Sequence, residues 1–97
     1  MPTYVSLISW TEQGIKNFRD TTKRASEFTK LVEAHGGKVR EVLWTVGEYD
    51  LVSVVEFPDE ESGVAALLQQ GSSGNIRSNT MRALSAREMD DIIARTS

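Results

Sequence analysis

Three polar side chains of this sequence could take part in catalysis. Asp50 could act as a general base while the neighbouring Tyr49 hydroxyl donates a hydrogen bond to a ligand oxygen, and His35 is the only histidine. A structural role competes with each assignment. An aspartate can accept amide hydrogen bonds in a turn, a tyrosine ring can cover the end of a sheet, and a histidine suits the last turn of a helix.

Arginines are the residues that could hold an anion. Arg24, Arg77 and Arg82 are the candidates, because a guanidinium group can bind a carboxylate or phosphate at two points. The segment 74–87 contains no acidic residue. Arginines on an edge strand also prevent unwanted strand pairing, so this alternative stays open. A cation at position 24 opposes the dipole of the expected helix, which indicates a specific partner such as Asp20, Glu48 or Asp50.

Aromatic side chains could line a pocket for a small molecule between helices and sheet. Aromatic residues at strand positions more often belong to a hydrophobic core, and the pocket is weighed against that alternative. The predicted ligand-binding residues are Trp10, Arg24, Trp44, Tyr49, Thr80 and Arg82.

No cofactor or metal site is predicted. The chain has no cysteine and one histidine, which excludes thiolate ligands and a site built from several histidines of one chain. Glu41 and Glu56 could approach a cation across a hairpin, yet a carboxylate pair without further ligands is usually only solvated. Neither a phosphate loop, a nucleophile elbow nor zinc-ligand spacing occurs.

Composition indicates a globular chain. Its 97 residues predict one domain, 1–97, with 39% hydrophobic and 26% charged residues. A net charge of −3 gives no general attraction for nucleic acid, and no apolar run is long enough to cross a membrane. The N-terminus does not look like a secretion signal, so we expect a cytoplasmic protein.

Alternating and helical patterns predict four strands and three helices. The strands are expected at 3–10, 38–46, 51–57 and 75–84, rich in β-branched and aromatic residues. One helix is expected over 20–35, ending at Gly36-Gly37, and a second after the N-cap Asp59. Ser85 and Glu88 form a capping box at the start of the last helix, whose apolar side is Met89, Ile92 and Ile93.

This order predicts an α+β, ferredoxin-like βαββαβ fold with an extra C-terminal helix. Its four-stranded antiparallel sheet would carry two main helices on one face. If the hairpin loop has four residues, 47–50, then Val46 faces Leu51 and Glu41 faces Glu56. Two carboxylates opposite each other are unfavourable unless solvated, protonated or bridged by a cation.

Both faces of this sheet are expected to be apolar. Val5, Leu7 and Val54 belong to one face, whereas Ile8, Trp10 and Val55 belong to the other. A monomer would expose an unusually large apolar patch, so we predict a homodimer packed face to face as a dimeric α+β barrel. Alternatively, the final helix folds over part of the open face.

Seven short motifs follow one another along the chain: 10-WTEQGI-15, 23-KR-24, 36-GGKV-39, 47-GEYD-50, 56-EFPD-59, 74-GNIR-77 and 80-TMRA-83. They resemble the landmarks of the GYD domain family, in the family's order and over nearly the whole length. The resemblance implies a ferredoxin-like domain that assembles as a dimeric α+β barrel, and no established activity. Members of the wider barrel class include cofactor-free monooxygenases, heme-binding enzymes, isomerases and ligand-sensing modules.

Three functions remain open. The leading hypothesis is a homodimeric module that binds or senses a small apolar or aromatic molecule with an anionic group. The second is a cofactor-independent enzyme of the monooxygenase or isomerase kind, in which the pocket excludes water. The third is a structural subunit of an oligomer.

Overall fold

The computed structural model describes residues 1–96. Its elements follow the predicted order, with β1 (Thr3–Trp10), α2 (Thr21–Ala34), β2 (Lys38–Trp44), β3 (Leu51–Glu56), α3 (Glu60–Gly71), β4 (Ile76–Ala83) and α4 (Ala86–Ile93). A short helix α1 (Glu12–Lys16) and a 3-10 turn (Phe18–Asp20) add to them. None of the helices in the described residues is long and apolar enough to cross a membrane.

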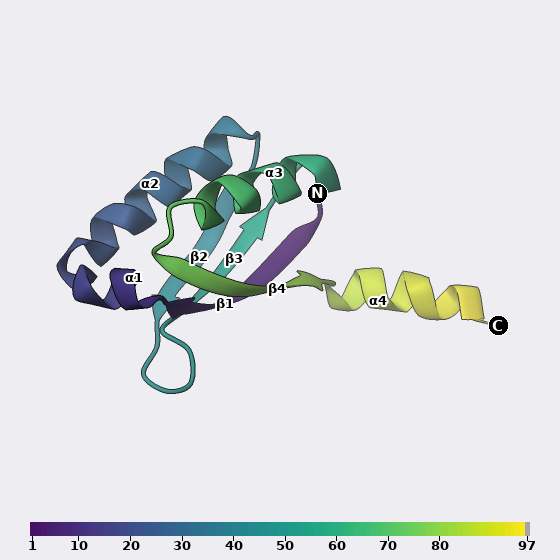
Figure 1. Ribbon diagram of the computed structural model, residues 1–97. Coiled ribbons are helices and arrows are strands. Elements are labelled where there is room, and N and C mark those ends of the chain that lie inside the picture. The colour runs from purple at the N-terminus through teal and green to yellow at the C-terminus, as the bar shows by residue number, and fades with distance from the viewer. Residues whose placement is uncertain (97) are drawn as a thin grey trace.

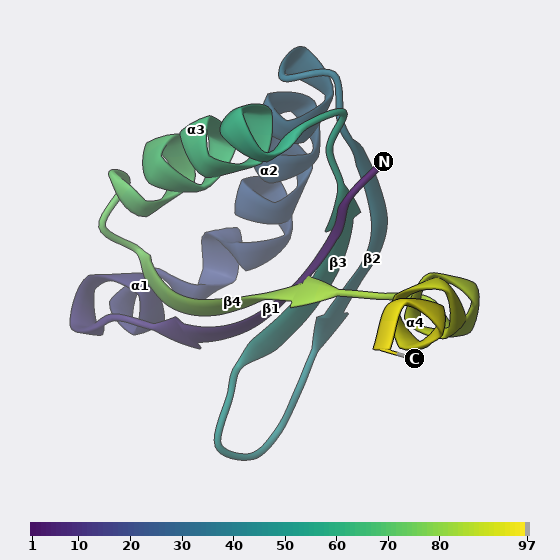
Figure 2. The same cartoon turned by 90° about the vertical axis from the view of Figure 1, so that its right-hand side faces the viewer.

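The sheet is antiparallel, with the strand order β2-β3-β1-β4. This order and the βαββαβ sequence of elements make the fold ferredoxin-like, as predicted. Helices α2 and α3 lie side by side on one face of the sheet (Figure 1). Seen along the sheet, both helices are on the same side, and the strands curve around them (Figure 2).

The core lies between this face and the helices. Val32 from α2, Val55 from β3, and Phe57 after β3 are fully buried, and Tyr4 packs edge-on against Phe57 with 6.1 Å between ring centroids. Along β3 buried and half-buried residues alternate, because successive side chains of a strand point to opposite faces. Gly36 ends α2 with φ +79°, the left-handed conformation expected of a C-terminal glycine.

The hairpin register differs from the prediction by two residues. Trp44 pairs with Leu51, and the loop comprises the six residues 45–50. Asp50 explains the longer loop, because its amide donates to Ile8 O (2.8 Å) and its Oδ2 accepts from the Trp10 amide (2.9 Å). A two-residue slip leaves the side chains of residues 41–44 on their predicted faces, whereas the register shift between Val39 and Glu41 places Val39 opposite Val55, on the helix-facing side.

The predicted Glu41–Glu56 pair is therefore wrong. Glu41 pairs with Val54, and Glu56 lies opposite Lys38. The Arg40 guanidinium forms an ion pair with the Glu56 carboxylate at 3.1 Å, beside a register shift between Val39 and Glu41. The extra residue in β2 brings a cation to Glu56, where the prediction had two like charges.

Helix α1 is the element that the sequence analysis does not predict. Its five residues are too few to show a helical pattern, and contacts with the distant start of β4 hold it. The Thr11 amide donates to Asn75 O (3.1 Å) and the Thr11 hydroxyl to Gly74 O (2.6 Å). A Cβ at Gly14 would lie 2.0 Å from Asn75 O, so only glycine permits this close approach.

The C-terminal helix α4 points away from the body of the molecule (Figure 1). It begins with the predicted capping box of Ser85 and Glu88, and the Arg82 guanidinium lies 3.8 Å from the Glu88 carboxylate. Met89, Ile92 and Ile93 are exposed, so α4 does not cover the helix-free face of its own sheet. The alternative in which it does is not the arrangement of this chain.

Candidate functional site

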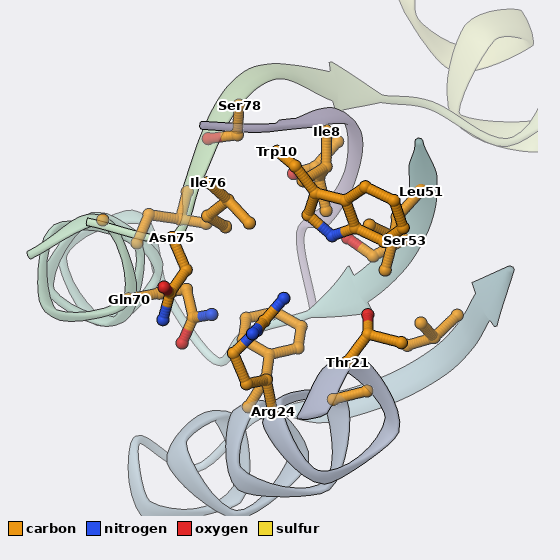
Figure 3. A pocket seen from close by; sticks show the side chains of 16 residues that line it. Ile8, Trp10, Thr21, Arg24, Leu51, Ser53, Gln70, Asn75, Ile76 and Ser78 are labelled. Atoms are coloured by element: carbon orange, nitrogen blue, oxygen red, sulfur yellow. The ribbon is translucent and has the colours of Figure 1, made fainter. Parts of the chain in front are cut away.

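A cavity lies between the sheet and helices α2 and α3, next to the start of β4 (Figure 3). Its volume is about 60 Å³, and it opens to solvent. The lining residues come from all four strands, from both main helices and from the segment before β4. They are Ser6, Ile8, Trp10, Thr21, Arg24, Ala25, Phe28, Val42, Leu51, Ser53, Leu67, Gln70, Gly71, Asn75, Ile76 and Ser78.

Three serines on adjacent strands form part of the cavity floor. Ser6 and Ser53 are directly paired on β1 and β3, and each is only 2% exposed. Ser78 follows on β4, opposite Ile8. The Ser6 hydroxyl shares a hydrogen bond of 2.8 Å with the Thr80 hydroxyl, whereas the Ser53 hydroxyl has no hydrogen-bond partner within residues 1–96.

The walls of the cavity are apolar. Trp10, at the end of β1, and Ile76, at the start of β4, are a directly paired couple on the helix-facing side of the sheet. Phe28 from α2 and Leu67 from α3 complete the walls from the helix layer. These side chains would surround the hydrocarbon part of a bound molecule and exclude water from it.

Arg24 reaches into the cavity from α2, toward Gln70 and Asn75 (Figure 3). Its guanidinium donates to Asn17 O (2.8 Å) and Gly14 O (3.2 Å) near the end of α1. No carboxylate of residues 1–96 forms an ion pair with it. The partners of Arg24 are therefore carbonyl oxygens and not the acidic residue expected from the sequence. Only two of the five N–H donors of a guanidinium are used in this way.

The charge of the lining is therefore positive. Arg24 is the only charged residue among those that form the cavity, although the whole chain carries a net charge of −3. Asn75 Oδ1 accepts from Gln13 Nε2 at 3.0 Å, which leaves the Asn75 amide nitrogen as a donor. An arginine with free donors, next to an amide donor, is suited to a carboxylate or another small anion.

The structure brings two of the six predicted ligand-binding residues, Trp10 and Arg24, into the lining. Two others contact lining residues. The Trp44 indole donates to the Thr21 hydroxyl at 2.9 Å, and the Thr80 hydroxyl bonds to Ser6. Trp44 and Thr80 thus support the cavity without lining it.

The other two predicted ligand-binding residues lie elsewhere. Tyr49 is in the hairpin loop, where its carbonyl accepts from the Thr45 hydroxyl at 2.5 Å. The Arg82 guanidinium lies over the Tyr4 ring (5.8 Å to its centroid), donates to Thr3 O (3.2 Å) and pairs with Glu88. Arg82 thus connects the start of β1 with α4.

None of the three catalytic candidates lines the cavity. Asp50 joins the hairpin to β1 through the Trp10 amide, and it does not line the cavity. His35 follows α2, and its Nε2 lies 3.2 Å from Gln69 Oε1 of α3. Tyr49, His35 and Asp50 therefore occupy a loop, a helix end and a strand junction.

Lowered pKa values occur at helix starts outside the cavity. The Ser62 amide donates to Asp59 at the start of α3 and lowers the pKa of its carboxyl group. The Ser85 amide does the same for the pKa of Glu88 at the start of α4. Both shifts arise from capping hydrogen bonds, which favour the charged carboxylate.

Sequence reasoning missed Ser6, Ser53, Gln70 and Asn75 as site residues. A signal for the serines exists, because Ser6 and Ser53 interrupt otherwise apolar helix-facing positions in the two central strands. Gln70 and Asn75 belong to a polar segment without a periodic pattern, and only the tertiary structure brings them to Arg24.

Comparison with known proteins gives matches over most of the chain. The model of the GYD domain family matches residues 4–93. A relative from Thermus thermophilus is 30% identical over 96 residues, which are 98% of each chain. That relative is described as a glutamine synthetase and cystathionine beta-lyase binding protein.

Two solved structures resemble the fold. TTHA0845 from Thermus thermophilus superimposes with a TM-score of 0.55 at 26% identity, over 89% of this chain and 96% of that chain. TA0507, a protein named as a candidate chlorite dismutase, gives a TM-score of 0.56 at 16% identity. The match covers 89% of this chain but 45% of that chain, and at this identity it supports the fold alone.

Proposed function

We propose that this chain, which belongs to the GYD domain family, is a homodimeric module that binds or senses a small anionic molecule in the cavity between sheet and helices. The observation that carries this proposal is Arg24, the only charged lining residue, with unused donors and no acidic partner within residues 1–96. A bound carboxylate would supply the missing negative charge.

The homodimer is supported by the helix-free face of the sheet. Val5 and Val54 are directly paired at its centre, and Leu7 and Val52 form the next pair. Leu43 (51% exposed) and Met81 (43% exposed) extend the patch to the outer strands. A second copy packed against this face would bury these side chains on both chains in a two-fold interface.

Calorimetric titration of the full chain with short monocarboxylates tests the binding proposal. We expect binding to wild type and a loss of about tenfold or more in Arg24→Gln, since hydrogen bonds to a charged group are strong. Arg19→Gln is the matched control, because Arg19 lies over the Phe18 ring and outside the cavity lining. Equal binding by wild type and Arg24→Gln, or no binding by wild type, would refute the proposal.

A second candidate function is the binding of other proteins. The relative from Thermus thermophilus is named for binding two enzymes, and this chain presents the exposed apolar residues of α4. Its test is light scattering of the purified chain mixed with glutamine synthetase or cystathionine β-lyase of the same source organism. A heavier complex that Ile92→Glu abolishes would support this function, and unchanged masses for both mixtures would refute it.

A further inference from the structure

Ser53 is a buried polar residue that the fold leaves without a partner. It is 2% exposed and lines the cavity, and its hydroxyl bonds to no residue within 1–96. In the described residues, no side-chain nitrogen or oxygen atom that lacks a hydrogen-bond partner is completely shielded from solvent. The Ser53 oxygen lacks a partner, so it is accessible from the cavity. Its neighbour Ser6 is equally buried but is satisfied by Thr80. Ser53 therefore has a free donor and a free acceptor directed at the cavity, and such groups in folded proteins usually find a partner.

Donors for an anion come from a different part of the lining. Arg24 extends from the helix layer, whereas Ser53 belongs to the sheet layer opposite it (Figure 3). The Asn75 amide nitrogen and the side chain of Gln70 lie on the same side of the cavity as Arg24. Apolar side chains of Trp10, Phe28 and Ile76 form the walls of the same cavity.

The cavity is too small to enclose a large ligand. Its volume of about 60 Å³ is well below the roughly 150 Å³ of an apolar cavity that admits benzene, so it encloses only part of a ligand of that size, and the rest of the molecule would extend through the opening to solvent.

We propose that the cavity recognises a short aliphatic carboxylate that carries a second oxygen, a hydroxyl or carbonyl, at the opposite end. Its carboxylate binds Arg24 and Asn75, its carbon chain lies against Trp10 and Ile76, and its distal oxygen bonds to the Ser53 hydroxyl. This inference rests on the proposed binding function and specifies its ligand class.

Matched pairs of acids test the role of Ser53. The probes are 4-hydroxybutanoate with its counterpart pentanoate, and 5-hydroxypentanoate with hexanoate, titrated calorimetrically into the full chain. We expect wild type to prefer a hydroxy acid over its counterpart by about three- to tenfold, the worth of one hydrogen bond. Ser53→Ala should abolish this preference while it still binds the alkyl acid. Ser9→Ala is the matched control, because Ser9 lies on the same sheet but on its helix-free face.

Thermal unfolding without ligand separates this role from a structural one. A hydroxyl without a protein partner contributes nothing to the fold, so Ser53→Ala should unfold at the same temperature as wild type or a higher one. Equal binding of both acids of each pair by wild type, or a preference that survives Ser53→Ala, would overturn this inference and leave the proposed function standing. Absence of binding for all four acids would overturn both.

Discussion

Asp50, the last residue of the hairpin loop, connects distant parts of the chain. Its carboxylate accepts from the Trp10 amide and its own amide donates to Ile8 O, so it fixes the hairpin against the end of β1. Trp10 in turn forms a wall of the cavity. Of the two roles considered for Asp50 from the sequence, these contacts favour the structural one.

Replacement of Asp50 by alanine should therefore destabilise the fold. We expect the free energy of unfolding to fall by about 1–3 kcal/mol, because the Trp10 amide loses its acceptor. Urea unfolding measures this effect, and Glu48→Ala in the same loop is the control with an exposed side chain. Equal stabilities of the two variants would show that the hydrogen bond does not matter.

The sequence predicted those cavity-lining residues whose side-chain type and position in an element both suggested a binding role. Trp10 and Arg24 were identified because an aromatic residue ends a strand and a cation stands against a helix dipole. Ser53 was missed although it interrupts an apolar strand face, because only the structure shows that it is buried beside a cavity. Asn75 was missed because its place beside Arg24 depends on the pairing of β4 with β1.

At the level of elements, Gly14 determines how closely α1 approaches β4. A methyl group there would lie 2.0 Å from Asn75 O, and Gly14 O also accepts from Arg24. Gly14→Ala should lower the free energy of unfolding by about 1–3 kcal/mol through overpacking. It should also weaken carboxylate binding, since Arg24 and Asn75 would move apart. Urea unfolding and calorimetry measure the two effects.

Gly71 provides the matched control for Gly14. It is the last residue of α3, and a Cβ there would have no neighbour within 4 Å. Gly71→Ala should leave stability unchanged or raise it by up to about 1 kcal/mol, the difference in helix propensity. If Gly14→Ala behaved in the same way, the close approach of α1 to β4 would be refuted.

The capping box of α4 should make this helix sensitive to acid. The capping hydrogen bond lowers the pKa of Glu88 from its ordinary 4.5. A carboxyl group whose pKa is lowered by folding stabilises the folded form above its unfolded pKa, and this contribution is lost as the pH falls through the folded pKa. The protection factors of the α4 amides, which are corrected for the intrinsic pH dependence of hydrogen exchange, should therefore fall below the ordinary pKa.

Glu88→Gln is the control for this titration. Glutamine can still accept from the Ser85 amide but does not titrate, so the protection factors in α4 should depend less on pH in this variant. The other acidic residues of α4, Asp90 and Asp91, are present in both proteins. Coinciding pH profiles for wild type and Glu88→Gln would contradict the role given to Glu88.

Elements were predictable where their signals are local. The capping box, the Gly36 end of α2 and the alternation in β1 lie within a few residues of the boundaries they set. The hairpin register was not predictable, because the loop length depends on hydrogen bonds between Asp50 and β1, which lies far away in the sequence. Helix α1 likewise depends on its contacts with Gly74 and Asn75.

At the scale of the whole molecule, the helix-free face and the projecting α4 leave large apolar side chains uncovered in one chain. Val54 lies at the centre of this face, paired with Val5 on one side and Glu41 on the other. Light scattering should give the mass of a dimer for wild type. Val54→Asp should shift the mass to that of a monomer, since a charge would be buried in the interface.

Val46→Asp is the control for this shift. Val46 is fully exposed in the hairpin loop, so the same substitution there should leave the dimer intact. A monomeric wild type at micromolar concentration, or a dimer that persists in Val54→Asp, would contradict face-to-face pairing. The cavity lies on the opposite face of the sheet, so this result would not decide ligand binding.

The most direct test of the binding account is a crystal structure of the full chain grown with 4-hydroxybutanoate. The account predicts the carboxylate within hydrogen-bond distance of the Arg24 guanidinium, the chain beside Trp10 and the hydroxyl at Ser53. Density for the acid at another place, or a cavity that holds only water at a saturating concentration of the acid, would contradict it.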